Sequence, residues 1–507
     1  MSMKIQKEKR EKGLIILSLF DGMSCGRLAL EKAGIKIDKY MASEIKQFAI
    51  DHTMARYPDT IPVGDVTRIH YDRNTKTLYA NCEKKLIASF GEKKTDLTMA
   101  GKDAWTQEEL DAFEAQGFKQ NKSGEIVRVA YTEEEMREFE EKGYDTILTN
   151  DPNLSGDIVE WDVTNADVVY VGDIDMLIGG SPCQNFSMAN SFVNSKSYGL
   201  AGEKSRLFNE YYRIKNEVNP TYFFLENVKM KRDSEEMLNR FMGVDGLHIN
   251  SNTISIQHRD RIYWTNIKDF KNFDEDTMSP TFNNIAQPTP RKVYLCRKNN
   301  TVPSVSFQDY KIKTIARIEN ILRKKRFEEH KLTLDENDIK ELALTPDEIK
   351  WICEENAWVR KEVEKGRRLG KPDGKRMKNL TDEDFVKFIH EVLMESLVKK
   401  TPSRDKMWNE GKTAQFACKN ITNEDKMSCL TRKQDRFPNS GLIEFGDYCR
   451  FVNRLEICKG QTVPYDFLAD LTYAQIQDVC GDGWTVDVIS YIFKHLKQVY
   501  DFDTHND

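Results

Sequence analysis

Three short motifs in the middle of the chain carry side chains that could do chemistry together. Cys183 stands in GGSPCQNFS, directly after the apolar run MLI, so we expect it in the loop at the end of a buried strand. Sheets of the α/β class place their ligands at that edge. A lone cysteine is more often an inert buried residue than a nucleophile. The neighbouring motifs therefore decide whether Cys183 is a candidate nucleophile.

The second and third motifs supply an acid and two cations. Glu226 follows the apolar run FFL in FFLENV, where burial can raise the pKa of a carboxyl group. Arg259 and Arg261 alternate in QHRDRIYW, so in a strand they would point to the same side. Each also has a plainer interpretation. The acid could cap a strand end, and the arginines could form surface salt bridges worth about 0–1 kcal/mol.

A glycine-containing turn near the N-terminus indicates a nucleotide-like ligand. The turn DGMSCG lies between the strand-like run GLIILSLF and the helical run GRLALEKAG, and Gly22 and Gly26 would let the backbone approach a ligand at the helix N-terminus. Glu44 ends the next strand-like run, where such folds hold ribose hydroxyls. Asp65, at the end of a third expected strand, could reach an adenine amine. A purely structural turn would show the same pattern.

These segments predict a doubly wound α/β sheet with two interruptions. The strand–helix pattern of residues 14–70 resumes at ADVVYVGD, DMLIGGSPC and PTYFFLENV. Between them, Trp105–Phe118 and Tyr131–Tyr144 form an internal repeat, in which a threonine is expected to cap each helix. Residues 101–165 carry 17 acidic and 6 basic side chains, a net charge of −11. This stretch is interpreted as a small inserted module.

The second interruption, residues 271–440, is rich in Lys, Arg and Glu. We expect helices over Pro346–Lys365 and Asp382–Lys399 and a basic loop over Gly366–Lys378. Residues 297–378 carry 21 basic and 15 acidic side chains, a net charge of +6, although the whole chain has −6. If DNA binds, this stretch is the better surface. The final run, GDGWTVDVISYIFKHLKQVY, predicts a closing helix.

Composition excludes some classes. The 507 residues are 31% charged and 39% hydrophobic and contain no apolar run long enough to cross a membrane. The charged start of the chain is a poor signal peptide. Ten cysteines without a CxxC pair indicate neither a zinc site nor a disulfide framework. We therefore expect a reduced, cytoplasmic setting.

Taken in order, the motifs resemble the DNA cytosine-5 methyltransferase family. The set is LSLFDGMSCG, SE, GD, GGSPCQNFS, FFLENV, QHRDRIYW, CRFVNRLEICKGQTVP and GDGWTVDVI. Several motifs look closest to the animal de novo enzymes, whereas PCQNFS is more similar to bacterial ones. The absence of chromatin-reading motifs favours a phage or bacterial origin, with a restriction-modification role and a bacterial or phage-infected host cytoplasm.

The resemblance implies an architecture. A doubly wound, Rossmann-like domain that uses S-adenosylmethionine would carry a mostly helical target-recognition domain. The expected parts are 1–70, 166–270 and 441–507 for the catalytic domain, 71–165 for the acidic insertion and 271–440 for target recognition.

The resemblance also implies the chemistry. Cys183 would add to C6 of a cytosine flipped out of duplex DNA, making C5 reactive. Glu226 would bind the base edge, while Arg259 and Arg261 would hold the cytosine and the Cys183 loop. Residues 187–202 would close over the base. No metal is expected. The residues expected to bind S-adenosylmethionine, which leaves as S-adenosylhomocysteine, are Phe20, Asp21, Gly22, Glu44, Asp65, Pro182, Trp484 and Val486.

Two alternatives stay open. An RNA cytosine-5 methyltransferase of the same fold would share the PCQ and ENV motifs, but the tRNA-modifying branch has a compact recognition region, whereas this chain has roughly 170 residues there. A non-catalytic DNA-binding relative would usually have lost the nucleophile or the cofactor turn. Double-stranded DNA is therefore the expected partner.

Overall fold

The structure is a computed structural model, which describes the chain in separate stretches. These are residues 13–88, 106–120, 126–128, 131–142, 144–147, 157–181, 206–267, 345–365, 381–399, 401–410, 418–432, 438–445 and 448–503.

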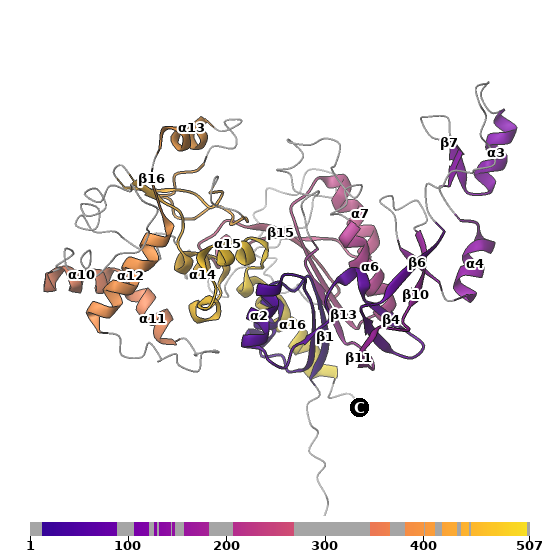
Figure 1. Ribbon diagram of the computed structural model, residues 1–507, viewed down its shortest axis with the longest axis horizontal. Coiled ribbons are helices and arrows are strands. Elements are labelled where there is room, and N and C mark those ends of the chain that lie inside the picture. Colours follow the sequence, from indigo (N-terminus) through magenta and orange to yellow (C-terminus); the bar gives the residue numbers. More distant parts are fainter. Residues whose placement is uncertain are drawn as a thin grey trace, which may run out of the picture.

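A seven-stranded sheet forms the centre of the molecule (Figure 1). Every neighbouring pair is parallel except the two pairs made by β15. The chain moves outward from β1 to β3 in one direction and from β12 onward in the other. The sheet therefore has a switch point between β1 and β12, where such folds bind ligands, and the predicted doubly wound fold is confirmed. In spatial order the strands are β14 (Leu247–Asn250), β15 (Asp260–Thr265), β13 (Tyr222–Val228), β12 (Met176–Gly179), β1 (Leu14–Leu19), β2 (Ile37–Ser43) and β3 (Ile61–Pro62).

Helices cover both faces of this sheet. Figure 1 shows α6 (Arg206–Val218) and α7 (Arg232–Met242) on one side of it. Along β1, Leu14 and Ile16 belong to one core and Ile15 and Leu17 to the other, which is the two-residue alternation of a strand buried on both faces. The helices that contribute to the core on the Leu14 side are α1 (Cys25–Ala33), α2 (Gln47–Arg56), α14 (Arg454–Gln461), α15 (Tyr473–Asp482) and α16 (Val486–Asp503).

One strand prediction is wrong, and another strand ends earlier than expected. ADVVYVGD does not rejoin the parallel sheet, because β11 (Asp167–Val171) pairs antiparallel with β5 (Thr77–Ala80) in a separate sheet completed by β4 (His70–Asp72). A short apolar run does not specify its partner strand, and both Val168 and Val171 are exposed here. The third expected strand is β3, but it ends at Pro62 and Asp65 lies in the loop that follows. Asp65 accepts a hydrogen bond from Thr67 N at 2.9 Å and caps the short turn η1 (Val66–Arg68).

The internal repeat of the insertion folds as a helix followed by a hairpin. In the first copy α3 (Gln107–Ala115) precedes β7 (Phe118–Gln120) and β8 (Ile126–Arg128), which pair antiparallel. In the second, α4 (Glu133–Glu141) precedes β9 (Asp145–Ile147) and β10 (Asp157–Asp162). As predicted, Thr106 and Thr132 cap the helices by accepting N–H groups three residues on.

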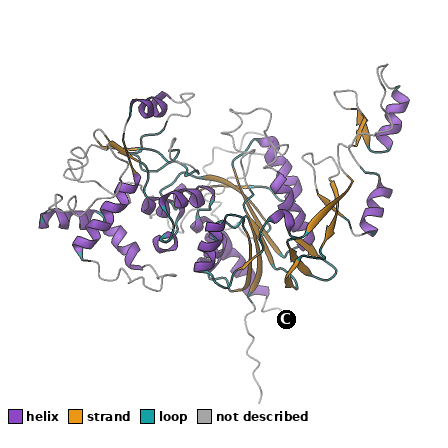
Figure 2. Cartoon of the chain, in the orientation of Figure 1, coloured by secondary structure: helices purple, strands orange, loops and turns teal. Residues whose placement is uncertain are grey.

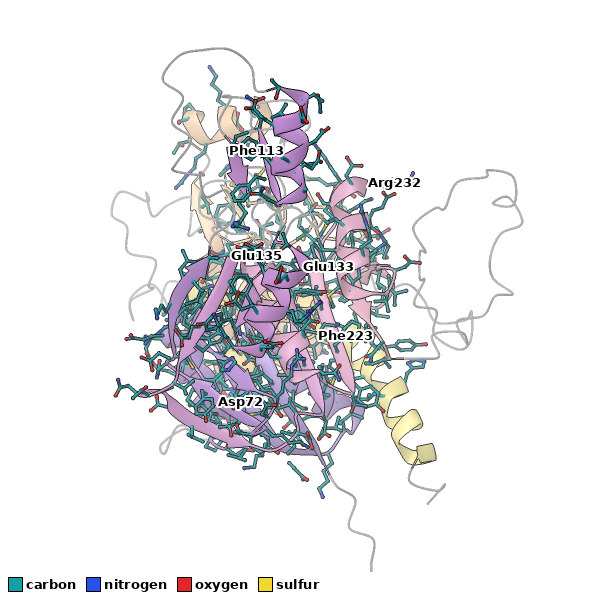
Figure 3. All side chains as sticks on the ribbon, turned by 90° about the vertical axis from the view of Figure 1, so that its right-hand side faces the viewer. Asp72, Phe113, Glu133, Glu135, Phe223 and Arg232 are labelled. Atoms are coloured by element: carbon teal, nitrogen blue, oxygen red, sulfur yellow. The ribbon has the colours of Figure 1, made fainter. Side chains whose placement is uncertain are left out.

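The second hairpin attaches the insertion to the main domain. Strand β10 pairs antiparallel with β6 (Glu83–Ala88). Trp161 on β10 stacks on His70 at 5.2 Å, and the guanidinium of Arg213 lies 4.6 Å from the indole ring. Helix α3 lies farther from the sheet, and Figure 3 shows its Phe113 well above Glu133 and Glu135 of α4.

Beyond the sheet, the described part of residues 345–410 is mostly helical, as predicted (Figure 2). Instead of one helix, Pro346–Lys365 forms α10 (Pro346–Glu355) and α11 (Ala357–Lys365), because the Asn356 side chain donates to Ile352 O at 2.9 Å and ends the first. The second expected helix is α12 (Asp382–Ser396). The last three residues of the expected helix Asp382–Lys399 instead form β16 (Leu397–Lys399), in a sheet with β18 (Tyr448–Arg450) and β17 (Ile443–Phe445). Helix α13 (Pro402–Glu410) follows β16.

The end of this region packs into the main core. Ile421, Met427 and Leu430 belong to the same hydrophobic core as β1 and α16. Arg454 of α14 also forms a bidentate ion pair with Glu395 of α12, at 2.7 Å for both contacts. The proposed domain boundaries remain predictions. The described helices include none long and apolar enough to cross a membrane.

Candidate active site

The turn between β1 and α1 is held by an internal hydrogen-bond cluster. The Asp21 carboxylate accepts from Ser18 Oγ at 2.6 Å, from Tyr40 OH at 2.7 Å and from Ser24 Oγ. Burial raises the pKa of Asp21, although these three hydroxyls pull it down. Asp21 therefore shapes the turn, and its carboxylate is already occupied by the protein.

Glu44 ties this turn to the end of the neighbouring strand. Its Oε2 accepts from Gly22 N at 2.9 Å, and its Oε1 accepts from Ile45 N and Lys46 N at 2.8 Å. Each carboxylate oxygen keeps further acceptor capacity. Ile45 itself is 74% exposed, an unusual state for a large aliphatic side chain beside a binding acid. Sequence reasoning missed Ile45, although an apolar residue after the strand-end acid was visible.

The backbone around Glu44 leaves room for a ligand. Gly22 and Gly64 both have left-handed φ angles, +59° and +73°, and a Cβ at either would meet no atom within 4 Å. Phe20 has φ of 57° and is partly exposed. The left-handed backbone, the Glu44 carboxylate and the Phe20 side chain together fit a nucleoside-like cofactor.

Trp484 links the cradle formed by residues 20–65 to Glu226 in FFLENV. A Cβ on Gly26 would lie 3.2 Å from the Trp484 ring, and a Cβ on Gly180 would lie 2.8 Å from its Nε1. The same Cβ would lie 3.2 Å from Glu226 Oε2, so Trp484 and Glu226 are neighbours, and the indole lowers the pKa of the Glu226 carboxyl group. Gly26 therefore admits Ile178 and Trp484 to the core, and not a ligand as the sequence suggested. Val486, fully buried, belongs to the core beneath the pocket.

Glu226 lies within β13, near its end, and is 6% exposed. Arg261 of β15 pairs with it, with Nε 2.8 Å from Oε1. Burial raises the pKa of Glu226 above its ordinary value, and Arg261 and Arg259 oppose that shift. A carboxyl group whose pKa is raised in this way binds a proton more readily than an exposed one, as a general acid must.

Arg259 is committed to the protein backbone. Its guanidinium donates to Leu430 O at 2.9 Å, to Gly481 O at 3.1 Å and to Gly483 O at 2.6 Å. It is 2% exposed. These carbonyls belong to two separate segments, so Arg259 fastens residues 418–432 to the end of α15. Its geometry supports a positioning role more than direct contact with a base.

The start of the Cys183 loop is pinned beside Glu226. Asn227 Nδ2 donates to Ser181 Oγ at 3.1 Å. Ser181 is the last described residue of this segment, so Pro182, Cys183 and the expected closing loop 187–202 lie outside the described residues. The basic loop 366–378 also lies outside them. Asn227 and Tyr40 are positioning residues that the sequence did not single out, since neither pattern nor spacing pairs them with their partners.

The geometry defines an α/β domain in which the glycine turn with Glu44 and the Glu226–Arg261 pair lie at one edge of the sheet. A family model, C-5 cytosine-specific DNA methylase, matches residues 84–498. This chain belongs to that family. The match begins after the glycine turn, so the interpretation of the cradle at residues 20–65 rests on its geometry alone.

Individual relatives cover parts of the chain. The Type II methyltransferase M.NgoFVII of Neisseria gonorrhoeae is 28% identical over 167 residues, 28% of this chain and 43% of that protein. The orphan methyltransferase M.Rho11sI of Bacillus phage rho11s is 31% identical over 119 residues, 21% of this chain and 23% of that protein. The chain thus matches less than half the length of these curated relatives.

One solved structure aligns along most of the chain but only loosely. A putative DNA modification methyltransferase encoded within an Escherichia coli prophage covers 96% of this chain and 100% of its own, with 15% identity and a TM-score of 0.38. So low a score carries no weight here. Bacterial and phage proteins both occur among the relatives, in keeping with the origin expected from the sequence.

Proposed function

We propose that this chain methylates C5 of cytosine in duplex DNA, with S-adenosylmethionine as the donor and Cys183 as the nucleophile. The observation that carries the proposal is the pairing of Glu226 with Arg261 at 2.8 Å. This pair lies beside Gly180, at the end of the strand that leads to Cys183. The family match supplies the chemical class.

The cofactor would lie across the cradle. Glu44 would accept the ribose hydroxyls, Ile45 would pack on the adenine face, and the backbone at Gly22 would face the amino-acid portion. Asp65 remains a proposed partner of the adenine amine. When bound, S-adenosylmethionine supplies an electrophilic methyl group. The cradle ends at Trp484, which also contacts Glu226, so methyl donor and base would meet there.

The chain's own groups would prepare the base. A thiolate at Cys183 adds to C6, a bond forms between Sγ and C6, and C5 becomes electron-rich. Glu226 would hydrogen-bond N3 and the exocyclic amine, stabilising the charge that develops on the ring. After C5 receives the methyl group, its proton leaves to water, the Sγ–C6 bond breaks and Cys183 is regenerated.

Reaching this pocket requires the cytosine to leave the helix stack, which costs a few kcal/mol. Only Pro182 separates Ser181 from Cys183, so their Cα atoms are at most about 7 Å apart. Asn227, which holds Ser181, would therefore anchor the loop within reach of Glu226. The Type II and orphan methyltransferase names among the relatives suggest a restriction-modification or phage role.

A mechanism-based trap tests this proposal. Duplex DNA with 5-fluorocytosine at the target should become covalently attached in the presence of S-adenosylmethionine, because fluorine cannot leave C5 as a proton does. The Cys183→Ser variant should form no adduct while still binding the cofactor. Wild-type turnover without adduct, or adduct formation by Cys183→Ser, would overturn the assignment of the nucleophile.

A further inference from the structure

A second cysteine lies against the arginines of the pocket. Cys429 comes from the segment 418–432, some 170 residues beyond QHRDRIYW. Its Sγ lies 3.6 Å from the terminal NH1 nitrogen of Arg259 and 3.8 Å from the terminal NH2 nitrogen of Arg261, and both contacts have hydrogen-bond geometry. No spacing in the sequence would have brought these three residues together.

Main-chain pairing fixes Cys429 in this place. Met427 N donates to Ile256 O and His258 N donates to Met427 O, both at 2.9 Å. Leu430, which directly follows Cys429, donates its N–H to Oε1 of the fully buried Gln257 at 2.7 Å. The segment is thus joined to the strand entry that carries Arg259 and Arg261, and the sulfur has a defined position.

Cys429 is connected to Glu226 through Arg261, which contacts both side chains. Arg261 uses Nε for Glu226, one terminal nitrogen for Asp260 O at 2.8 Å, and the other for the Cys429 sulfur. An arginine held on three sides loses little further freedom when it binds, which keeps its partner in one orientation. The sulfur is therefore one of three fixed points for the group that faces Glu226.

The charge environment of Cys429 differs from that of other cysteines. Burial would raise the pKa of its thiol, but Arg261 and Arg259 outweigh burial and lower the pKa below the ordinary value. By contrast, burial raises the pKa of Cys418, in the same segment, to about 12. Cys25 in the glycine turn is likewise raised to about 12. The charged groups that face Cys429 are the two arginines, with Glu226 across Arg261.

We propose that Cys429 is a positioning residue for methyl transfer, whose sulfur accepts from Arg259 and Arg261 and keeps Arg261 against Glu226. The base pocket is then completed by a segment that the sequence assigns to target recognition. Docking of that segment would align the acid that the base needs. This inference rests on the proposed role of Glu226 in the reaction.

Three variants test the role through the chemical step. Cys429→Ala should lower the single-turnover rate of methyl transfer about tenfold, with cofactor affinity changed less than twofold. Cys429→Ser should recover most of the rate, because a hydroxyl can accept from both arginines. Cys418→Ser, in the same segment but away from the pocket arginines, is the matched control and should keep the wild-type rate. A wild-type rate in Cys429→Ala, or a serine variant as slow as the alanine one, would overturn the proposal.

Thiol reactivity gives a readout that does not depend on turnover. Iodoacetamide labelling of the native protein, followed by peptide mass spectrometry across pH, should show Cys429 reacting at lower pH than Cys418. In Arg261→Gln the Cys429 profile should move to higher pH. An unmoved profile would show that the contact does not exist. Glu226→Gln separates the proposed function from the role of Cys429. If this variant keeps the full rate, the proposed role of Glu226 is wrong. If it is slow while Cys429→Ala is not, only the role of Cys429 is wrong.

Discussion

At the scale of single residues, environment distinguishes groups that look alike in the sequence. Cys25 and Cys429 both follow the dipeptide Met-Ser, yet burial raises the pKa of the first thiol and two arginines lower the pKa of the second. Glu226 is likewise set apart from Glu44. The first is enclosed by Trp484 and Arg261, while the second is partly exposed and binds backbone N–H groups. These environments fit the proposal that Glu226 serves the chemistry and Glu44 the cofactor.

The first prediction concerns Glu226. Glu226→Gln should lower the single-turnover rate of methyl transfer by about 10–100-fold and change duplex affinity little, because the contact strengthens as charge builds on the base. Glu210→Gln on α6, remote from the pocket, is a suitable control for removing a buried carboxylate. Equal losses of rate and affinity would indicate a glutamate that only supports the fold.

The second prediction concerns Gly180. A Cβ there would lie 2.8 Å from Trp484 Nε1 and 3.2 Å from Glu226 Oε2, so Gly180→Ala should displace both. We expect a loss of at least about tenfold in rate, since small misplacements of reacting groups are costly. Gly243→Ala, at a helix end with open space, is the control; it should cost about 1 kcal/mol in stability and leave the rate intact. Full activity of Gly180→Ala would refute this view of the pocket.

At the scale of elements, the insertion is a separate feature grafted onto the sheet edge. Its two copies of helix and hairpin carry most of the acidic side chains of residues 101–165. Phosphate repulsion would oppose DNA contact there. In Figure 1 the helices α3 and α4 lie on the opposite side of the sheet from α10 to α13, as expected for a module outside the DNA path.

The third prediction follows from the register of β6 and β10. Ala88 lies opposite Ile158, so residues 89–157 can be replaced by an Asn-Gly turn that closes the hairpin. The shortened protein should bind duplex DNA with unchanged affinity, measured by fluorescence anisotropy, provided circular dichroism shows a folded chain. A folded variant with much weaker binding would show that the insertion contacts DNA.

At the scale of the whole molecule, local patterns were predictable and long-range pairing was not. The glycine turn, the parallel strands β1, β12 and β13, and the closing helix α16 follow from runs of apolar residues and capping signals. The placement of β11 did not, because a five-residue apolar strand fits either sheet. Cys429 reaches Arg259 and Arg261 only through tertiary packing across a large sequence separation, and no single-chain pattern encodes that contact. Trp484 was expected near the cofactor only because of the family resemblance.

The fourth prediction concerns the basic run within the proposed recognition region, which lies outside the described residues. Neutralising Arg367, Arg368, Lys371 and Lys375 together should weaken binding to all duplex sequences alike, because lysine and arginine here would contact phosphates. The slope of log affinity against log salt should fall by about one unit per lost contact. A changed methylation site at unchanged affinity would mean that this run reads bases.

The central claim is the identity of the product, and nucleoside mass spectrometry tests it most directly. DNA and tRNA from cells expressing this chain would be digested and compared with those from cells expressing Cys183→Ser. The account predicts 5-methyldeoxycytidine in DNA from the wild type, none from the variant, and unchanged tRNA. Methylation confined to tRNA, a methyl group on the exocyclic amine, or 5-methyldeoxycytidine that persists in Cys183→Ser would contradict it.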